Sequence, residues 1–413
     1  MMNYFIRHSG INGDSKLLDP FSGSGVALFA GLGKGYSSVG VEILPIGNYV
    51  IKNRTKINKI KRDDLEKALN DCTNMDFSKY CTSKDKYRHL AITAGAFPEE
   101  NEKQLLGFLN YCKEEYSNKN TVSILKFAAF CILEGISYTR KDGQYLRWDY
   151  RANKNGNGHA KFDKGNIPSF RDAIFEKLSE INEDILFWGK QDSSVDYSKL
   201  TLLEGSVLDL LPALKTKSIN IIITSPPYCN RYDYTRTYAL ELAFLGVNDN
   251  KLKSLRQELL TCTVENKEKS DRLKSVYIEN RRTKDYDFIV NTFNTHSGLQ
   301  EVLSTLDNLR RDDKLNNPNI YRMVKNYFYE MFFVIFELYR VLKENGCVYM
   351  VNDNVRYGGE EIPVDLILSS FADTIGFKIK NIWTIDIGKG NSSQQMGKHG
   401  RTELRKCVYV WQK

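Results

Sequence analysis

Several patterns are missing from this sequence, and each absence excludes a class of protein. No apolar run reaches the roughly 18 residues that a membrane-spanning helix needs. The N-terminal segment MMNYFIRHSG lacks the apolar core of an export signal, so we expect a cytoplasmic protein. The eight cysteines include no C-x-x-C pair, and we therefore expect no zinc site and no requirement for a metal. There is also no internal repeat.

The charge is moderate in sum but unevenly distributed. The formal net charge is +8 over 413 residues, which does not by itself identify a nucleic-acid-binding protein. Residues 52–62 hold six basic residues and no acidic one, and residues 140–171 hold eight basic and three acidic residues. Such clusters attract phosphate backbones. The alternative is a solvated basic surface without a partner.

The order of the expected elements indicates a parallel sheet. A strand, a Gly-rich turn and a helix open the chain, and a second strand and a basic helix follow. The apolar run at 219–223 suits a strand that is buried on both faces. We expect strands at 16–19, 38–43, 200–204, 219–224, 347–352, 378–387 and 404–411, and helices at 26–32, 47–60, 121–134, 170–186, 320–343 and 363–375. Gly346 is interpreted as the stop signal of the long helix at 320–343.

These elements predict an α/β fold with two large insertions. The expected core is a doubly wound, mostly parallel, seven-stranded Rossmann-like sheet formed by residues 1–62 and 199–413. Residues 63–198 interrupt the alternation and form a mostly helical inserted domain. Residues 248–318, rich in Lys, Arg and Asn, form a second insertion.

The Gly-rich turn and the acidic residue after it indicate an adenosine-containing cofactor. Asp19-Pro-Phe-Ser-Gly-Ser-Gly25 follows a strand and opens a helix, and its glycines let the backbone approach a ligand closely. Glu42, at the end of the second strand, can accept hydrogen bonds from both ribose hydroxyls. A tight strand-to-helix turn without a ligand is the alternative for the turn taken alone. The turn lacks the third spaced glycine of nicotinamide-dependent oxidoreductases.

The motif Thr224-Ser-Pro-Pro-Tyr228 narrows the chemistry. It follows the buried strand, and its two prolines hold the backbone rigid and donate no N–H, so nearby carbonyls remain acceptors at the ligand-binding edge. An exocyclic base amine is a poor nucleophile because its lone pair is delocalised into the ring. The Ser225 side chain and the Pro226 carbonyl could hold both amino hydrogens and favour a pyramidal nitrogen, while Tyr228 stacks on the base.

With these motifs, the sequence resembles the amino-methylating DNA methyltransferases of bacterial modification systems. DPFSGSG resembles their cofactor motif, and TSPPY resembles their catalytic motif in the serine form, which is more often associated with cytosine-N4 than with adenine-N6 methylation. The resemblance covers roughly residues 1–60 and 200–413. It implies S-adenosylmethionine as cofactor, with Asp19, Phe21, Gly23 and Gly25 at its methionine end, Glu42 on the ribose, Asp209 on the adenine amine, and Ser225, Pro226, Pro227 and Tyr228 in catalysis. Asp209 could instead be an ordinary acidic residue at a helix start.

The resemblance also shows where this chain departs from the family. The family usually has a segment that covers the methionine carboxylate, and here residues 3–8 are the candidate for it. The gap between the second and third strands is unusually long, so the target-recognition region cannot be placed by analogy. Cys229 follows the catalytic motif, but cytosine-C5 enzymes carry a Pro-Cys pair that this chain lacks. We therefore expect Cys229 to play no part in the chemistry.

The expected substrate is double-stranded DNA, with a cognate restriction endonuclease as a possible partner. The target base must leave the duplex to reach a buried catalytic turn. Residues 143–165 combine aromatic and basic residues and are preferred over 250–285 as the recognition segment. The polar loop at 391–401 could line the base pocket. The expected DNA-binding residues are Arg147, Arg151, Lys154, Arg231, Arg236 and Arg401. Adenine-N6 methylation, RNA amino-methylation and a catalytically inactive nucleic-acid-binding subunit remain as alternatives.

Overall fold

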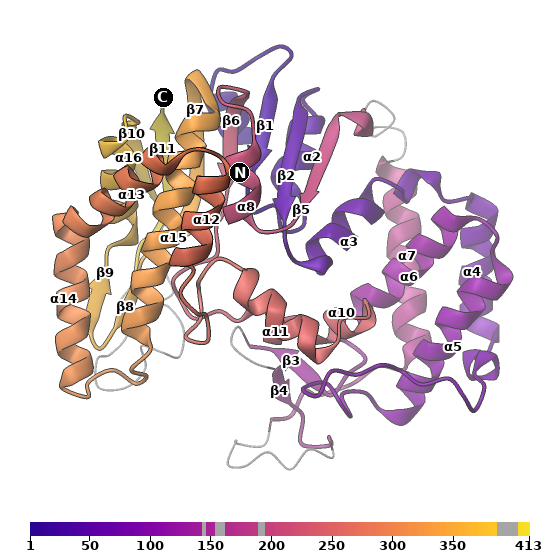
Figure 1. Cartoon of the computed structure of the whole chain (residues 1–413). Helices are drawn as coiled ribbons and strands as arrows, with labels where there is room; N and C mark the ends of the chain where they lie inside the picture. Colours follow the sequence, from indigo (N-terminus) through magenta and orange to yellow (C-terminus); the bar gives the residue numbers. More distant parts are fainter. Residues whose placement is uncertain (143–145, 153–161, 189–194, 386–403) are drawn as a thin grey trace. The chain divides into compact units, whose positions relative to one another are not determined.

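The computed structural model describes residues 1–142, 146–152, 162–188, 195–385 and 404–413 (Figure 1). The chain divides into two compact units. The first, here called the sheet unit, comprises Met1–Leu44, Asp196–Tyr232 and Arg256–Lys413. The second, here called the helical unit, comprises Pro45–Val195 and Asp233–Leu255. No helix within the described ranges is long and apolar enough to cross a membrane.

The sheet unit is built on seven strands in the order β10-β11-β7-β6-β1-β2-β5 (Figure 1). Five neighbouring strands, from β7 to β5, pair in parallel, and β11 runs antiparallel to β7 and to β10. This arrangement confirms the predicted α/β class and the mostly parallel, seven-stranded sheet. The strands are β1 Lys16–Asp19, β2 Ser37–Glu42, β5 Leu200–Glu204, β6 Ile219–Thr224, β7 Leu342–Asp353, β10 Lys378–Ile385 and β11 Lys406–Gln412.

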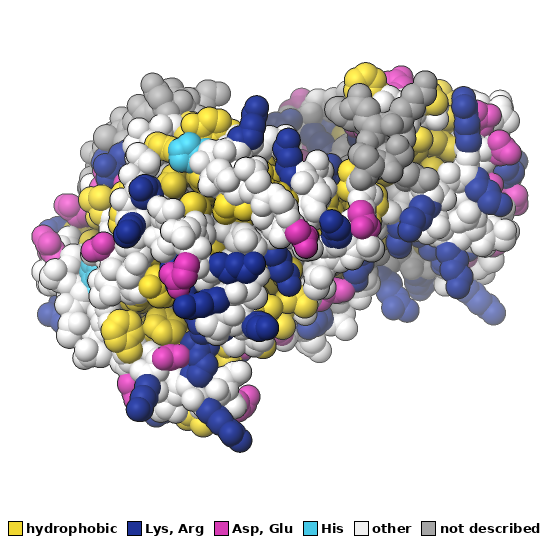
Figure 2. Space-filling view, turned by 90° about the horizontal axis from the view of Figure 1, so that it is seen from above, with side chains coloured by type: hydrophobic (Ala, Val, Ile, Leu, Met, Phe, Trp, Pro, Cys, Tyr) yellow, Lys and Arg dark blue, Asp and Glu magenta, His cyan; other side chains and the backbone are white. Residues whose placement is uncertain are grey.

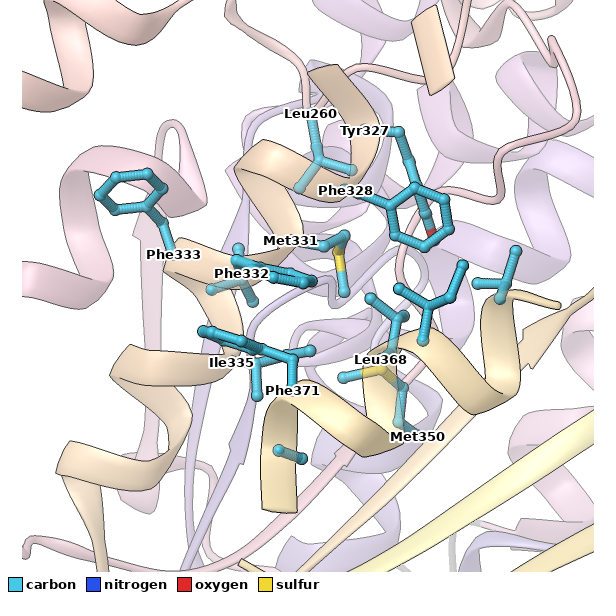
Figure 3. Close-up of a cluster of buried hydrophobic side chains, with 14 of the residues drawn as sticks. Leu260, Tyr327, Phe328, Met331, Phe332, Phe333, Ile335, Met350, Leu368 and Phe371 are labelled. Carbon is cyan, nitrogen blue, oxygen red and sulfur yellow. The ribbon is translucent and has the colours of Figure 1, made fainter. Parts of the chain in front are cut away.

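Helices on the sheet bury a large aromatic and aliphatic core. The centre of that core is the long helix α15, Ile320–Val341, whose buried face packs on the sheet and on α16, Val364–Thr374 (Figure 3). The rings of Phe332 and Phe371 stack with centroids 3.7 Å apart. The other helical elements of this unit are α1 Met2–His8, α2 Val26–Leu32, η4 Tyr197–Lys199, α8 Val207–Ala213, α12 Ser270–Glu279, α13 Thr283–Thr295 and α14 Ser297–Arg311.

The second predicted insertion, residues 248–318, is largely helical in the structure. Apolar residues of α12, α13 and α14, such as Leu273, Phe293 and Leu303, are buried in the same core as α15. These helices therefore extend the sheet unit. The first helix of this insertion, α11 Asp249–Glu258, has residues in both units, because the boundary between them falls after Leu255.

The helical unit has its own hydrophobic core. A cluster of rings at Phe77, Phe108, Tyr111 and Phe170 joins its main helices. Gly107 allows the closest contact, because a Cβ there would lie 1.9 Å from the Phe77 carbonyl oxygen. The elements of the helical unit are α3 Pro45–Arg54, η1 Ile57–Lys59, α4 Arg62–Asn74, η2 Phe77–Tyr80, α5 Glu99–Glu115, α6 Lys119–Ile132, β3 Thr139–Lys141, β4 Leu146–Trp148, α7 Phe170–Trp188, α9 Tyr234–Thr237 and α10 Ala239–Phe244.

One predicted stop signal was wrong. The long helix ends at Val341, earlier than residue 343, and β7 begins at the next residue. Gly346 lies inside β7 and does not terminate the helix. A Cβ at Gly346 would lie 2.9 Å from the carbonyl oxygen of Asn220 in β6, so glycine is required by close strand packing. Asn345 has φ +62° and lies where the register between β6 and β7 is irregular.

Candidate active site

The two predicted motifs meet at one edge of the sheet. The Gly-rich turn leaves the carboxyl end of β1, and the Ser-Pro-Pro-Tyr turn leaves the carboxyl end of β6, the strand beside it. The chain order reverses direction across the sheet at β1 and β6, and ligands of doubly wound folds bind at such a point. The Thr224 hydroxyl donates to an Asp19 carboxylate oxygen over 2.8 Å and joins the two turns directly.

Hydrogen bonds between residues of the Gly-rich turn stabilise its conformation. The buried Asp19 carboxylate also accepts a hydrogen bond from the Phe21 backbone N–H, at 3.1 Å, and the Ser22 hydroxyl donates to the Asp19 carbonyl at 2.9 Å. Gly23 and Gly25 have φ values of +51° and +81°, in the left-handed region that favours glycine. No atom lies within 4 Å of the position that a Cβ on Gly23 would occupy. The backbone therefore borders open space at this point.

Glu42 connects the end of β2 to the same turn. One carboxylate oxygen accepts the Gly23 N–H at 2.6 Å, and the other accepts the Leu44 N–H at 2.7 Å. Burial raises the pKa of Glu42 to about 7 in spite of these hydrogen bonds. Burial likewise raises the pKa of Asp19 to about 6, although Thr224 and the Phe21 N–H oppose the rise. The site thus contains two carboxyl groups that ionise at unusually high pH.

The catalytic turn presents its side chains at the end of β6. Ser225 is exposed, Pro226 is buried, and the Ser225 and Tyr228 hydroxyl oxygens lie 3.1 Å apart. Burial raises the pKa of Tyr228 to about 12, so its phenol is neutral at physiological pH. The ammonium of Lys406, from β11, lies 6.0 Å from the centre of the Tyr228 ring. Pro226 and Pro227 donate no backbone hydrogen bonds, as the sequence requires.

Cys229 is enclosed behind the catalytic turn. Its side chain is fully buried, and burial raises the pKa of its thiol well above the ordinary range. A neutral, inaccessible thiol cannot act as a nucleophile at neutral pH. The Cys229 carbonyl accepts a hydrogen bond from the Tyr357 hydroxyl at 2.5 Å. Tyr357 belongs to a small hairpin of β8, Val355–Tyr357, and β9, Glu360–Ile362, which contacts the turn through this hydrogen bond.

Asp209 lies in the first turn of α8 and is paired with an arginine. The Arg272 guanidinium of α12 binds both of its carboxylate oxygens, with 3.1 Å between Nε and Oδ1. Both side chains are about one-third exposed. The predicted contact of Asp209 with adenine stays a prediction, and it would have to coexist with this ion pair.

The expected DNA-binding residues of the helical unit have different surroundings. Arg147, in the hairpin of β3 and β4, is 43% exposed and stacks on Phe162, with its guanidinium carbon 4.6 Å from the ring centre. Arg151 instead binds both oxygens of the buried Asp149 and also donates to the Gly165 carbonyl. Arg151 therefore has a structural role in holding this segment. Lys154 lies outside the described residues.

The remaining predicted DNA contacts follow the catalytic turn or lie far along the chain. Arg231 adopts φ +67°, and its guanidinium lies 3.4 Å from the Asn316 side-chain oxygen. Arg236, in the short helix α9, lies 3.4 Å from the Asp233 carboxylate. Arg401 falls outside the described residues. Figure 2 shows Lys and Arg side chains spread widely over one face of the molecule, with Asp and Glu between them.

Sequence reasoning missed several residues that shape this edge of the sheet. Gly40 in β2 is required by packing, since a Cβ there would lie 2.5 Å from the Ser22 hydroxyl oxygen. Tyr357, Lys406 and Asp353 come from strands far along the chain, and no local motif marks them. The only available signal was that Asp353 ends an apolar strand, at the edge where ligands bind.

Comparison with known proteins identifies the family of this chain. No protein-family model matches it. The chain is 46% identical over 407 residues to the type II methyltransferase M.AvaI of Nostoc sp. and to that of Anabaena variabilis, covering 96% of this chain and 80% of each relative. It is 40% identical over 429 residues to the type II methyltransferase M.BsoBI of Geobacillus stearothermophilus, covering all of this chain and 83% of the relative. The chain therefore belongs to the type II methyltransferases, the DNA methyltransferases of bacterial restriction-modification systems.

Proposed function

We propose that this DNA methyltransferase transfers a methyl group from S-adenosylmethionine to the exocyclic N4 amine of a cytosine flipped out of duplex DNA. The observation that carries the proposal is the hydrogen bond between Thr224 and Asp19, because it places the two motifs side by side at the switch point of the sheet. A methyl donor on the Gly-rich turn and a base on the Ser-Pro-Pro-Tyr turn would then be neighbours.

The residues of the Gly-rich edge fit S-adenosylmethionine. The open space beside Gly23 allows a ligand to approach the backbone, and Asp19, Phe21 and Gly25 would surround its methionine end. Glu42 would bind the ribose, since a carboxylate oxygen can accept more than one hydrogen bond. Asp209 would accept a hydrogen bond from the adenine amine while paired with Arg272. When bound, this cofactor supplies an electrophilic methyl group on a sulfonium.

The catalytic turn fits a planar base that bears an amine. The Ser225 hydroxyl and the Pro226 carbonyl would accept the two amino hydrogens, and Pro227 would keep the turn rigid. Tyr228 would stack on the flipped ring, with its orientation fixed by the 3.1 Å contact to Ser225. Stacking of this kind is worth roughly 1–3 kcal/mol per base. The choice of cytosine over adenine rests on the serine in this motif.

Basic side chains are the proposed contacts to the phosphates of duplex DNA. Arg147 and Arg231 are proposed phosphate contacts, together with Arg236, Arg151, Lys154 and Arg401 from the sequence prediction. The Arg147 side chain is 43% exposed on the hairpin of β3 and β4, where its Nε atom lies 3.7 Å from the Asp142 carboxylate. We therefore also propose that the insertion at 63–198 carries target recognition. A restriction endonuclease of the same specificity is the proposed biological partner.

Nucleoside analysis of DNA from cells that express the protein tests the proposal directly. We expect N4-methylcytosine in that DNA and none in DNA from cells that express Ser225→Ala or Tyr228→Ala. N6-methyladenine would overturn the choice of base and leave the amine mechanism standing, whereas 5-methylcytosine would refute the mechanism. Both variants should retain cofactor affinity in calorimetry, because neither residue belongs to the Gly-rich turn. Glu42→Ala should lower that affinity by about 1–3 kcal/mol.

A further inference from the structure

Asp353 lies at the level of the catalytic turn on the neighbouring strand. It is the last residue of β7, which runs parallel to β6, and the last paired residues of these strands are Thr224 and Met350. Asp353 is three residues beyond Met350, as Pro227 is three residues beyond Thr224. Its position in the register therefore places it beside the Ser-Pro-Pro-Tyr turn.

Glu241 has a buried carboxylate oxygen without a partner, but its other oxygen pairs with Lys141, whereas the half-buried Asp353 carboxylate forms no ion pair in the part of the chain that the structure describes. The Oδ1 atom of Asp353 is buried and has no hydrogen-bond partner there. By contrast, Glu330 binds Lys269 at 2.8 Å and Thr261, and Asp365 binds Arg405 at 3.1 Å. Leaving a buried acceptor unsatisfied costs about 1–3 kcal/mol, so such a group calls for an explanation.

The groups around Asp353 connect it to the catalytic tyrosine. Lys406 is its direct cross-strand partner in β11, and the Lys406 ammonium lies 6.0 Å from the centre of the Tyr228 ring. The negative charge of Asp353 contributes to the raised pKa of Tyr228. The Asp353 carboxylate and the Lys406 ammonium are thus both close enough to influence the Tyr228 ring, on which a base would stack.

The chemistry of amine methylation requires a proton acceptor. As the nitrogen attacks, the N–CH₃ bond forms and the CH₃–S bond breaks, and the sulfonium becomes a neutral thioether. The nitrogen then carries a positive charge together with its two original hydrogens. One N–H bond must break, with its electron pair returning to nitrogen, to give the methylamino product. The Ser225 hydroxyl and the Pro226 carbonyl can hold these hydrogens, but neither is a base of useful strength.

We propose that Asp353 is a further catalytic residue, whose carboxylate takes the proton from the methylated amine and later releases it to solvent. The inference rests on the proposed amine methylation and deepens it. In this assignment, the Oδ1 atom without a partner accepts the amino hydrogen, and the positive charge of Lys406 favours the ionised form of the carboxyl group.

The charges around Asp353 give the reaction a defined pH dependence. Burial raises the pKa of Asp353 above its ordinary value, and the positive charge of Lys406 opposes the rise. The other titratable groups that feel its charge are Tyr228 on the catalytic turn and Cys407 and Tyr409 on β11, and burial raises the pKa of all three so that they stay neutral. Only the ionised carboxylate can accept a proton, so the rate should fall as pH drops through the pKa of Asp353.

The test is a single-turnover assay with radiolabelled S-adenosylmethionine and unmethylated genomic DNA, run from pH 5 to 9. We expect Asp353→Asn to lower the rate at pH 8 by about 10²-fold or more, the usual contribution of a proton-transfer group, and to leave only the acid limb that Asp19 and Glu42 produce. Cofactor affinity in calorimetry should be unchanged. Asp373→Asn, an exposed aspartate of α16, is the matched control and should behave as the unaltered protein.

The pH profile of a Lys406 variant gives a second test of the role of Asp353. Lys406→Met should move the acid limb to higher pH, because it removes the positive charge that opposes protonation of Asp353. A limb that does not move, or an Asp353→Asn rate within about threefold of the unaltered rate, would overturn the assignment. If Asp353→Asn fails to fold, the Lys406→Met profile decides alone. If the unaltered protein forms no methylamino base, it is the proposed function that fails.

Discussion

The buried carboxyl group of Glu42 should make the protein less stable as pH rises. Its pKa in the folded protein is about 7, against an ordinary value of 4.5, because burial disfavours the charged form. Between these two values the folded state keeps a proton that the unfolded state has lost. The free energy of unfolding therefore has its full contribution from this group below about pH 4.5 and loses it as pH rises through about 7.

The magnitude follows from the difference between the two pKa values. One unit of pKa corresponds to about 1.4 kcal/mol, so Glu42 should reduce the free energy of unfolding by about 3 kcal/mol between pH 4.5 and pH 7. The exposed fraction of Glu42 is only 8%, so solvent screening removes little of this effect. Burial raises the pKa of Asp19 to about 6, so Asp19 should further reduce the free energy of unfolding as pH rises, over a lower pH range than Glu42.

The assay is urea denaturation at several pH values from 5 to 8.5, with the unaltered protein and Glu42→Gln compared at each pH. Glutamine cannot ionise, so the stability difference between the two proteins should change by about 3 kcal/mol across the range, with the unaltered protein relatively weaker at high pH. Glu360→Gln, an exposed residue of β9, is the control and should show a constant difference. If the Glu42→Gln difference is also constant with pH, the carboxyl group is not buried as described.

Three further predictions concern other contacts. Thr224→Val should destabilise the protein by about 1–3 kcal/mol at pH 8, measured by denaturation, because the ionised Asp19 loses a hydrogen bond. Phe332→Ala should cost about 3–5 kcal/mol in the same assay, since the ring is fully buried against Phe371. Arg147→Gln should lower the salt dependence of DNA binding by about one unit of slope, whereas the exposed Lys217→Gln should leave it unchanged.

The sequence predicted the sheet well because its signals are local. Hydrophobic runs bounded by turn residues gave β1, β5 and β6 at or near their observed limits, and the helix after the Gly-rich turn was predicted at its observed bounds, Val26–Leu32. The positions of both motifs at strand ends followed from the same patterns. The error at the end of α15 arose because close packing of β7 on β6 requires a glycine at 346, and a helix-stop rule does not distinguish this cause from a helix end.

What the sequence did not reveal depends on contacts between distant residues. The hydrogen bond from Thr224 to Asp19 spans 205 positions, and the pairing of Asp209 with Arg272 spans 63. Neither partner choice has a local signature. The predicted phosphate contact of Arg151 stays a prediction, and the structure adds that its guanidinium binds Asp149, two residues away. Composition identified the basic segment but could not show which carboxylate each of its arginines would contact.

The acidic groups at this edge of the sheet have a common physical consequence. Asp19, Glu42 and Asp353 stand at the carboxyl ends of β1, β2 and β7, and burial raises the pKa of all three. Their desolvation disfavours the ionised forms in the free protein, and a cation such as the proposed sulfonium would favour these ionised forms when it binds. A buried carboxylate interacts more strongly with a cation than an exposed one does. The cost of burying these groups in the free protein would thus be offset when a cationic methyl donor binds, and the charge lost from the sulfonium on transfer would favour release of the neutral product.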